Sequence, residues 1–192
     1  MTAAGRARRA AALLALSAAG CIGGWRREYP AYWAALAPPP AKECPDVTGT
    51  WLDTPEEDPF VNYPPRLAVL LLGPGDAPTG GRTPRPHHLR LEQPSPDALE
   101  IVLLREDGTE VERHPLRRGH GFGCENGALV LEPPGFSGNA NVCVGFESKR
   151  VALSRDVRGR LVARIASRDI CVGLLNAWFW DTEWARFRPP TL

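Results

Sequence analysis

The second half of the chain alternates between hydrophobic and polar residues with the period of two that β-strands require. Turn-forming pairs such as Asp107-Gly108, Asn126-Gly127 and Arg158-Gly159 separate these runs at intervals of about 8–12 residues. We expect strands at 88–92, 98–104, 109–114, 120–124, 128–132, 142–147, 151–155 and 161–167. This succession predicts a mostly β fold, with antiparallel sheet forming a small sandwich or a partial barrel.

Proline changes this picture in the first half of the chain. Fifteen of the twenty prolines lie between Pro30 and Pro96, and proline is excluded from helix interiors and central strands. We therefore expect turns and edge elements there, with a Pro/Gly-rich loop near 73–86. The organisation predicted is one β domain over 44–192 behind a Pro-rich N-terminal tether, 21–43, with a helical turn at 31–37.

The end of the chain is rich in aromatic residues, with five within the ten residues from Trp178 to Phe187. One interpretation is that they complete the core as a final strand. The other is an exposed surface or cleft for a ligand or partner, because large apolar patches rarely stay exposed without use. The tryptophans that could form such a surface are Trp51, Trp178, Trp180 and Trp184.

The N-terminus has the order of charges of a secretory signal. The first twenty residues carry three arginines and no acidic residue, and 10–20 is uncharged. As a helix that uncharged stretch would span about 16 Å, roughly half of a hydrocarbon core, so it is too short for a transmembrane helix. We expect residues 1–20 to be removed as a signal peptide.

The junction Leu16-Ser17-Ala18-Ala19-Gly20-Cys21 resembles the lipobox of bacterial lipoproteins, in which small residues lead into an obligatory cysteine. Ala18 stands where leucine is usual, and Ala18-x-Gly20 also fits ordinary signal peptidase at the same bond. The resemblance implies acyl chains, palmitate among them, on Cys21, and hence a membrane anchor. Because no aspartate follows Cys21, it also implies the periplasmic face of the outer membrane.

The cysteine count favours lipidation, because five is an odd number for an oxidising compartment. If Cys21 carries lipid, four cysteines remain and can close two disulfides in three ways. Closeness in sequence leads us to predict the pair Cys124–Cys143, which leaves Cys44–Cys171.

The run from Cys44 to Trp51, Cys-Pro-Asp-Val-Thr-Gly-Thr-Trp, resembles the start of many small proteobacterial lipoproteins, a group without an assigned activity. Its last three residues are similar to the Gly-x-Trp of lipocalins. That resemblance implies a barrel closed at one end by Trp51 beneath an arginine of the last strand, Arg186 or Arg188. The Thr-Asp-Tyr run expected later in lipocalins is absent.

Catalytic motifs are not recognisable. Ser137, in Gly-Phe-Ser-Gly, lacks the glycine spacing of Gly-x-Ser-x-Gly. The carboxylates at 56–58 are expected to be a solvated charge run, and Asp181 and Glu183 to pair with arginines such as Arg186. We predict no catalytic residue and no cofactor.

Metal binding is not expected either. His87 and His88 are adjacent, so on a strand they would point to opposite faces. His114, His120 and Cys124 lack the paired spacing of zinc ligands.

Charge narrows the range of partners. Without the three arginines of the first twenty residues, 20 basic residues face 22 acidic ones, and a nucleic-acid partner would need a basic face. We expect a membrane-anchored envelope lipoprotein that acts through binding or structural contact, with an envelope protein as partner. The alternative is a lipocalin-like carrier of a small apolar ligand.

Overall fold

The computed structural model describes residues 21–38, 44–57, 65–78, 85–133, 139–140, 143–172 and 177–191. Most of the described chain is β-strand, as predicted. In chain order the elements are β1 (Cys21–Arg26), β2 (Gly49–Leu52), α2 (Leu67–Leu72), β3 (His88–Ser95), β4 (Ala98–Leu104), β5 (Glu110–Arg117), β6 (Phe122–Glu125), β7 (Ala128–Leu131), β8 (Asn139–Ala140), β9 (Cys143–Arg155), β10 (Leu161–Val172) and β11 (Ala177–Phe187).

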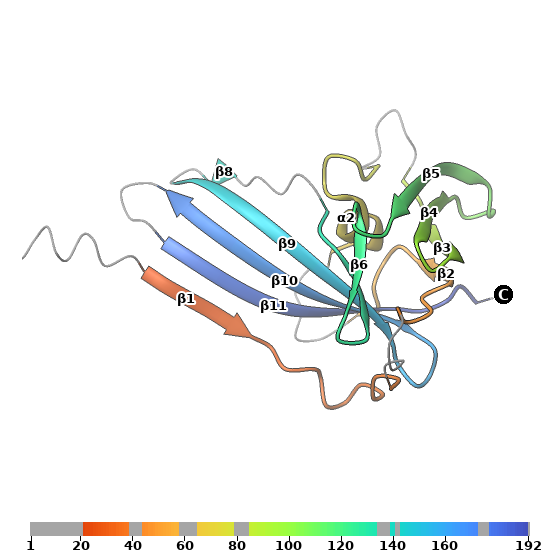
Figure 1. Ribbon diagram of the computed structural model, residues 1–192, viewed down its shortest axis with the longest axis horizontal. Coiled ribbons are helices and arrows are strands. Elements are labelled where there is room, and N and C mark those ends of the chain that lie inside the picture. The colour runs from red at the N-terminus through yellow and green to blue at the C-terminus, as the bar shows by residue number, and fades with distance from the viewer. Residues whose placement is uncertain are drawn as a thin grey trace, which may run out of the picture.

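The strands form two separate sheets (Figure 1). The larger sheet has the order β1-β11-β10-β9-β7-β6, with β8 paired to β9, and the smaller has the order β2-β3-β4-β5. Neighbouring strands are antiparallel, except that β1 runs parallel to β11. The described strands do not close into a barrel, so the sandwich is the part of the prediction that the structure confirms.

One hydrophobic core lies between the two sheets and takes in the short helix α2. Leu89 and Ile101 from the smaller sheet meet Leu161 and Phe187 from the larger one, all without solvent exposure. Inward positions therefore alternate with outward ones in both sheets, which is the pattern that gave the strand prediction.

Helix α2 was not predicted, because its sequence, Leu-Ala-Val-Leu-Leu-Leu, is apolar on every side and shows no helical period. Asp53 holds its first turn in place. One carboxylate oxygen accepts a hydrogen bond from the Ala68 amide at 2.8 Å, and the other pairs with Arg66. Burial raises the pKa of Asp53 above its usual value, and these hydrogen bonds act in the opposite direction.

The hairpin turns follow the sequence closely. Asn126 and Gly127 both have positive φ angles, 50° and 75°, between β6 and β7. Two successive residues with positive φ are what a two-residue turn between antiparallel strands needs, and Asn-Gly adopts it at little cost.

Two predicted strands proved to be one. The runs 142–147 and 151–155 belong, over their described part, to the single strand β9. Its register with β10 continues without a break, with Ser148 opposite Arg168 and Lys149 opposite Ser167. The residues between the two runs include no glycine or proline that would end a strand, so pairing with β10 carries β9 through them.

The disulfide of the described chain joins Cys44 to Cys124, with 5.1 Å between their Cα atoms. The predicted pairs Cys124–Cys143 and Cys44–Cys171 were therefore wrong. Closeness in sequence was misleading because Cys44, eighty residues earlier, is brought beside β6 by the packing of the N-terminal segment on the domain.

The described part of the expected tether contacts the domain. Residues 21–26 form the edge strand β1. Further on, the amide of Ala37 donates a hydrogen bond to the carbonyl of Arg155 at 2.8 Å. The amide of Val157 donates one to the carbonyl of Ala35 at 2.9 Å. Where a helical turn was expected at 31–37, the chain makes one tight turn closed by Trp33 and Pro30 and then runs extended.

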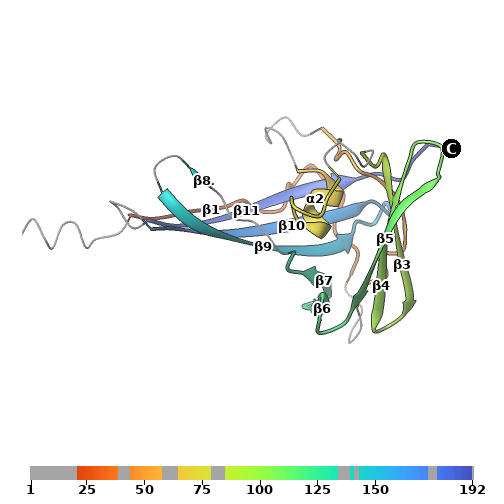
Figure 2. The ribbon, with the colours of Figure 1, turned by 90° about the horizontal axis from the view of Figure 1, so that it is seen from above.

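The larger sheet extends well beyond the core. Figures 1 and 2 show β9, β10, β11 and β1 projecting together from the part of the molecule that contains α2 and β2–β5. We call the projecting part the arm: residues 143–150, 166–172, 177–182 and 21–26, which are joined by register. The rest of the described domain is called the body.

Candidate functional site

Three consecutive aromatic residues at the start of β11 are exposed on the arm. Trp178 is 54% exposed, Phe179 46% and Trp180 42%. Successive residues of a strand point to opposite faces, so Trp178 and Trp180 share one face and Phe179 lies on the other. Of the arm residues whose exposure the structure describes, none is buried.

The two interpretations of the aromatic end therefore apply to different halves of β11. Ala185 and Phe187 lie in the core, 3% and 0% exposed. Trp184 is half-buried at the boundary, where its indole N–H donates to the carbonyl of Arg27 at 2.9 Å and its ring packs edge-on against Tyr29. Trp178 and Trp180 are the predicted surface residues that remain exposed on the arm.

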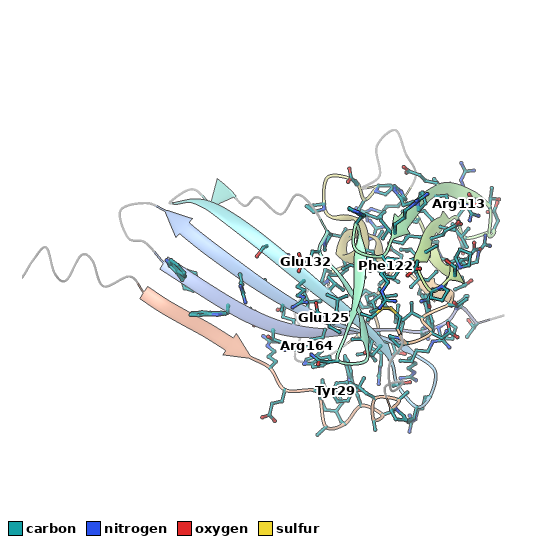
Figure 3. The ribbon with its side chains drawn as sticks, in the orientation of Figure 1. Tyr29, Arg113, Phe122, Glu125, Glu132 and Arg164 are labelled. Atoms are coloured by element: carbon teal, nitrogen blue, oxygen red, sulfur yellow. A yellow bond between two sulfur atoms is a disulfide. The ribbon has the colours of Figure 1, made fainter. Side chains whose placement is uncertain are left out.

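The face that carries Trp178 and Trp180 is called the outer face. Register places Arg168 opposite Trp180 and Arg164 opposite Trp184, so both arginines belong to this face. Both are exposed, and no ion pair or hydrogen bond joins either guanidinium to another described residue. Figure 3 shows Arg164 on the long strands of the larger sheet.

A further arginine of the outer face, Arg150 on β9, has acidic partners at its side. Arg150 pairs with Glu125 and, at 3.6 Å, with Glu132. Glu125 ends β6 and Glu132 directly follows β7, so neither comes from the long strands; both are labelled in Figure 3. Among the described outer-face positions of β9, β10 and β11 on the arm there is no acidic residue.

Cys21 begins the strand that borders these aromatics. Cys21 lies opposite Ala177 and Ile22 opposite Trp178, and β1 then runs from the end of the arm towards the body. The residue predicted to carry lipid thus lies at the edge of the sheet, one neighbouring strand from the exposed tryptophans.

Where the outer face reaches the body, residues 27–38 cover it. Trp33 is buried there, and the guanidinium of Arg186 lies 4.7 Å from the centre of its ring. Arg186 also donates to Glu56 at 2.5 Å, and Arg160 donates to the same oxygen at 3.0 Å. The expectation of a solvated charge run is therefore wrong for Glu56, whose side chain is largely buried in this cluster.

Trp51 lies apart from the arm. It is 3% exposed in the core, its indole N–H donates to Val47, and the guanidinium of Arg155 lies 5.2 Å from its ring. A tryptophan beneath an arginine is therefore present, but the arginine comes from β9. The assignment of Arg186 or Arg188 to that role was wrong.

The other residues considered from the sequence are not gathered into a site. Ser137 lies outside the described residues. Asp181 and Glu183 have no ion-pair partner in the described chain, and one carboxylate oxygen of Asp181 is buried without a hydrogen bond. Arg186, their expected partner, binds Glu56 instead.

His87 and His88 were expected to point to opposite faces of a strand, but their rings are in contact. His87 precedes β3, and its Nδ1 lies 3.2 Å from Nε2 of His88, so their rings meet edge to face. Cys124 is held in the disulfide with Cys44. The described chain contains no group of three or more histidine, cysteine or acidic residues arranged to hold a metal ion.

Phe179, Arg164 and Arg168 were not singled out from the sequence. The sequence does contain a pattern that indicates a positively charged face. Positions 164, 166 and 168 alternate arginine with alanine, and the alternate positions from 178 to 184 carry no acidic residue. Finding it required the register of β10 against β11, which only the fold supplies.

Comparisons with known proteins give no relative for this chain: it matches no family model, and neither the curated proteins nor the solved structures gave a match. The described residues form no helix with the length and hydrophobicity needed to cross a bilayer.

Proposed function

We propose that the protein is a lipid-anchored bacterial envelope protein that acts through binding or structural contact and not through catalysis. The anchor is acyl chains, palmitate among them, on Cys21, and the location is the periplasmic face of the outer membrane. The observation that carries the proposal is the position of Cys21 beside the exposed aromatic start of β11.

Two features of the arm support an anchor at this point. β1 is the last strand of its sheet, so its first residue lies at an edge and away from the core. Trp178 and Trp180 are of the residue type that membrane proteins concentrate at the headgroup level. A lipid on Cys21 would therefore attach the protein through the end of the arm and leave the body free for contacts.

The test is metabolic labelling with radioactive palmitate in a bacterial host, followed by fractionation of inner and outer membranes. We expect label in the wild-type protein, none in Cys21→Ser, and full labelling in the control Cys143→Ser. Label that persists in Cys21→Ser, or a wild-type protein without label, would contradict the proposal.

A catalytic role has its own test. A hydrolase activity of the purified protein that is lost in Asp181→Asn or Ser137→Ala would contradict the non-catalytic part of the proposal. No observation on the described residues favours the alternative of a lipocalin-like carrier, which stays a prediction from the sequence.

A further inference from the structure

The outer face of the arm combines exposed aromatic rings with arginines, two of which have no ion-pair partner among the described residues. Trp178 and Trp180 lie two residues apart on β11, about 7 Å along the strand. Arg168 is directly opposite Trp180, and Arg164 lies four residues further along β10, on the same face just beyond the arm. The tryptophans and the two arginines therefore form one continuous strip on a single face of the sheet.

The inner face of the same strands has a different composition. On β9, β10 and β11 its arm positions include Phe179, Asp181, Lys149 and Ser167, a mixture of both charges, and register adds Trp25 of β1 to this face. The two faces share the same backbone and the same distance from the core. On β9, β10 and β11, the tryptophans and arginines of the arm are thus confined to the outer face.

We propose that the outer face of the arm binds the surface of a bilayer that contains anionic phospholipids. Tryptophan rings are favoured at the headgroup level, where an apolar ring meets a polar N–H and water. Arginine binds phosphate oxygens in a two-pronged geometry and keeps its charge at any physiological pH. The location rests on the proposed anchor at Cys21, but the chemistry of the face does not depend on it.

Charge separates this occupant from a second copy of the chain. A symmetric dimer through the outer face would bring the same patch from both copies together, which places Arg164 and Arg168 near their own equivalents. No outer-face carboxylate on the described long strands of the arm is available to neutralise them. A phosphate surface complements this face, whereas a second copy of it does not.

The position of β1 makes the two contacts compatible. Cys21 and Trp178 both lie at the end of the arm, on the neighbouring strands β1 and β11. Neighbouring strands are about 5 Å apart, so the two residues are close to each other. Register gives Cys21 an inner-face position, but it is the first residue of the edge strand, so acyl chains on it would reach the bilayer around the end of the arm. Trp178 and Trp180, and then Arg168 and Arg164, would follow along the outer face. The arm would then lie along the membrane and hold the body in a fixed orientation.

The test uses the full chain with Cys21→Ser, recovered after export, so that no acyl chain contributes to binding. Cosedimentation is measured with vesicles of phosphatidylcholine alone and of phosphatidylcholine mixed with phosphatidylglycerol. We expect binding to the mixed vesicles and weaker binding to phosphatidylcholine alone. Added salt should weaken the first more than the second, because it screens the arginines.

Two double variants in the Cys21→Ser chain locate the contact. Arg164→Gln with Arg168→Gln should weaken binding to the mixed vesicles by about 25-fold, at about fivefold for each arginine near an anionic surface. The control Arg118→Gln with Arg158→Gln removes the same charge from exposed sites on the body and should bind like the unchanged chain. Trp178→Ser with Trp180→Ser should weaken binding to both kinds of vesicle.

Phe179→Ser is the matched control for the aromatic pair, because it removes an exposed ring of the same strand from the inner face. Equal loss in Phe179→Ser and in the tryptophan pair would overturn the proposal, as would no binding of the Cys21→Ser chain to mixed vesicles. A dimer that sedimentation detects and that the tryptophan pair dissociates would also overturn it and identify a second copy as the occupant. Absent palmitate label in the wild type would refute the anchor and leave this result untouched.

Discussion

The long strands β10 and β11 pair in one continuous register, but their two halves have different surroundings: one half lies in the body and the other in the arm. In the body half, Leu161, Ala163 and Phe187 are completely buried in the core. The opposite face of that half is covered by residues 27–38, with Trp33 buried against Arg186. In the arm half, aromatic rings are exposed on both faces. One continuous pairing of β10 with β11 thus carries a core in one half and an open surface in the other.

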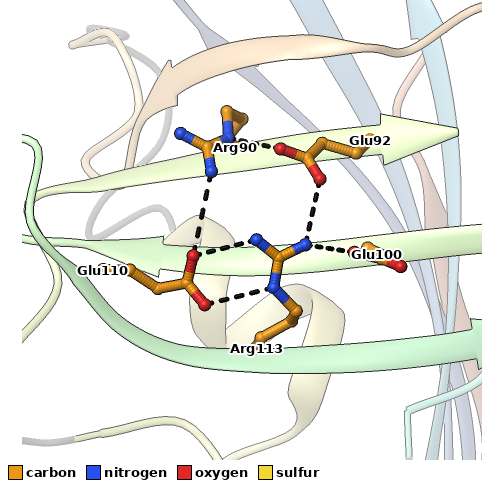
Figure 4. Close-up of polar contacts among 5 residues, drawn as sticks. All are labelled: Arg90, Glu92, Glu100, Glu110 and Arg113. Atoms are coloured by element: carbon orange, nitrogen blue, oxygen red, sulfur yellow. Dashed lines mark hydrogen bonds and ion pairs between the residues drawn. The ribbon is translucent and has the colours of Figure 1, made fainter. Parts of the chain in front are cut away.

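The smaller sheet has a solvent-exposed face on which arginines and glutamates form a network of ion pairs. Figure 4 shows Arg113 surrounded by Glu92, Glu100 and Glu110, with Arg90 bridging two of these glutamates. Arg90 and Arg113 thus each bind carboxylates of their own strand and of other strands of the sheet. Arg164 and Arg168, in contrast, form no ion pair with a described residue.

The largest expected effect separates the two halves of β11 directly. Phe187→Ala should lower the free energy of unfolding by about 3–5 kcal/mol, because it leaves a cavity in a closed core. Trp180→Ala should change it by no more than about 0.5 kcal/mol, since an exposed ring with no described partner loses little. Urea unfolding of both variants gives the two values. A Trp180→Ala loss as large as that of Phe187→Ala would mean that the arm is packed in solution.

The next effect concerns the covalent link in the body. The double variant Cys44→Ser with Cys124→Ser should lose about 2–4 kcal/mol, because the disulfide closes a long loop in the unfolded chain. Vesicle binding through the arm should be unchanged, since neither cysteine lies on it. Non-reducing peptide mapping of the wild type checks the pair itself, and recovery of Cys44 linked to Cys171 would contradict the structure.

Two arginines on the outer face provide a smaller and closely matched comparison. Arg186→Gln should cost about 1.5–3 kcal/mol, because it removes a charged hydrogen bond to the largely buried Glu56. Arg168→Gln should leave stability within about 0.5 kcal/mol of the wild type. Thermal or urea unfolding measures both, and equal losses would show that Arg168 has a partner within the folded chain.

The smallest effect is expected at the exposed network of the smaller sheet. Hydrogen bonds from Arg113 lower the pKa of Glu92 and Glu110 below their usual value near 4.5. A lowered pKa contributes stability above that value, and the contribution disappears as the pH falls through the folded-state pKa. Arg113→Gln should therefore be slightly less stable than the wild type at pH 7, with the difference closing in acid. A difference that grows in acid would contradict this sign.

The sequence predicted most of the strands and the hairpin turns, because these depend on local alternation and on residues such as Asn126-Gly127. It did not predict α2, whose uniformly apolar residues have no period, or the continuity of β9, which depends on pairing with β10. Trp51 and Trp180 look alike in the sequence, yet one is in the core and the other on the arm. Their exposure differs because Trp51 packs in the core between the two sheets, whereas Trp180 lies on the part of the larger sheet that extends beyond the core.

The sequence by itself determined the mostly β character and the antiparallel hairpins, since both rest on short-range alternation and turn residues. The signal peptide and the anchor at Cys21 stay predictions from the same kind of short-range pattern. Only the tertiary structure decided which cysteine joins Cys44, which arginine covers Trp51, and where the core stops along β11. These depend on contacts between residues far apart in the chain. The position of Cys21 beside Trp178 is also such a contact, because β1, at the start of the described chain, pairs in parallel with the last strand, β11.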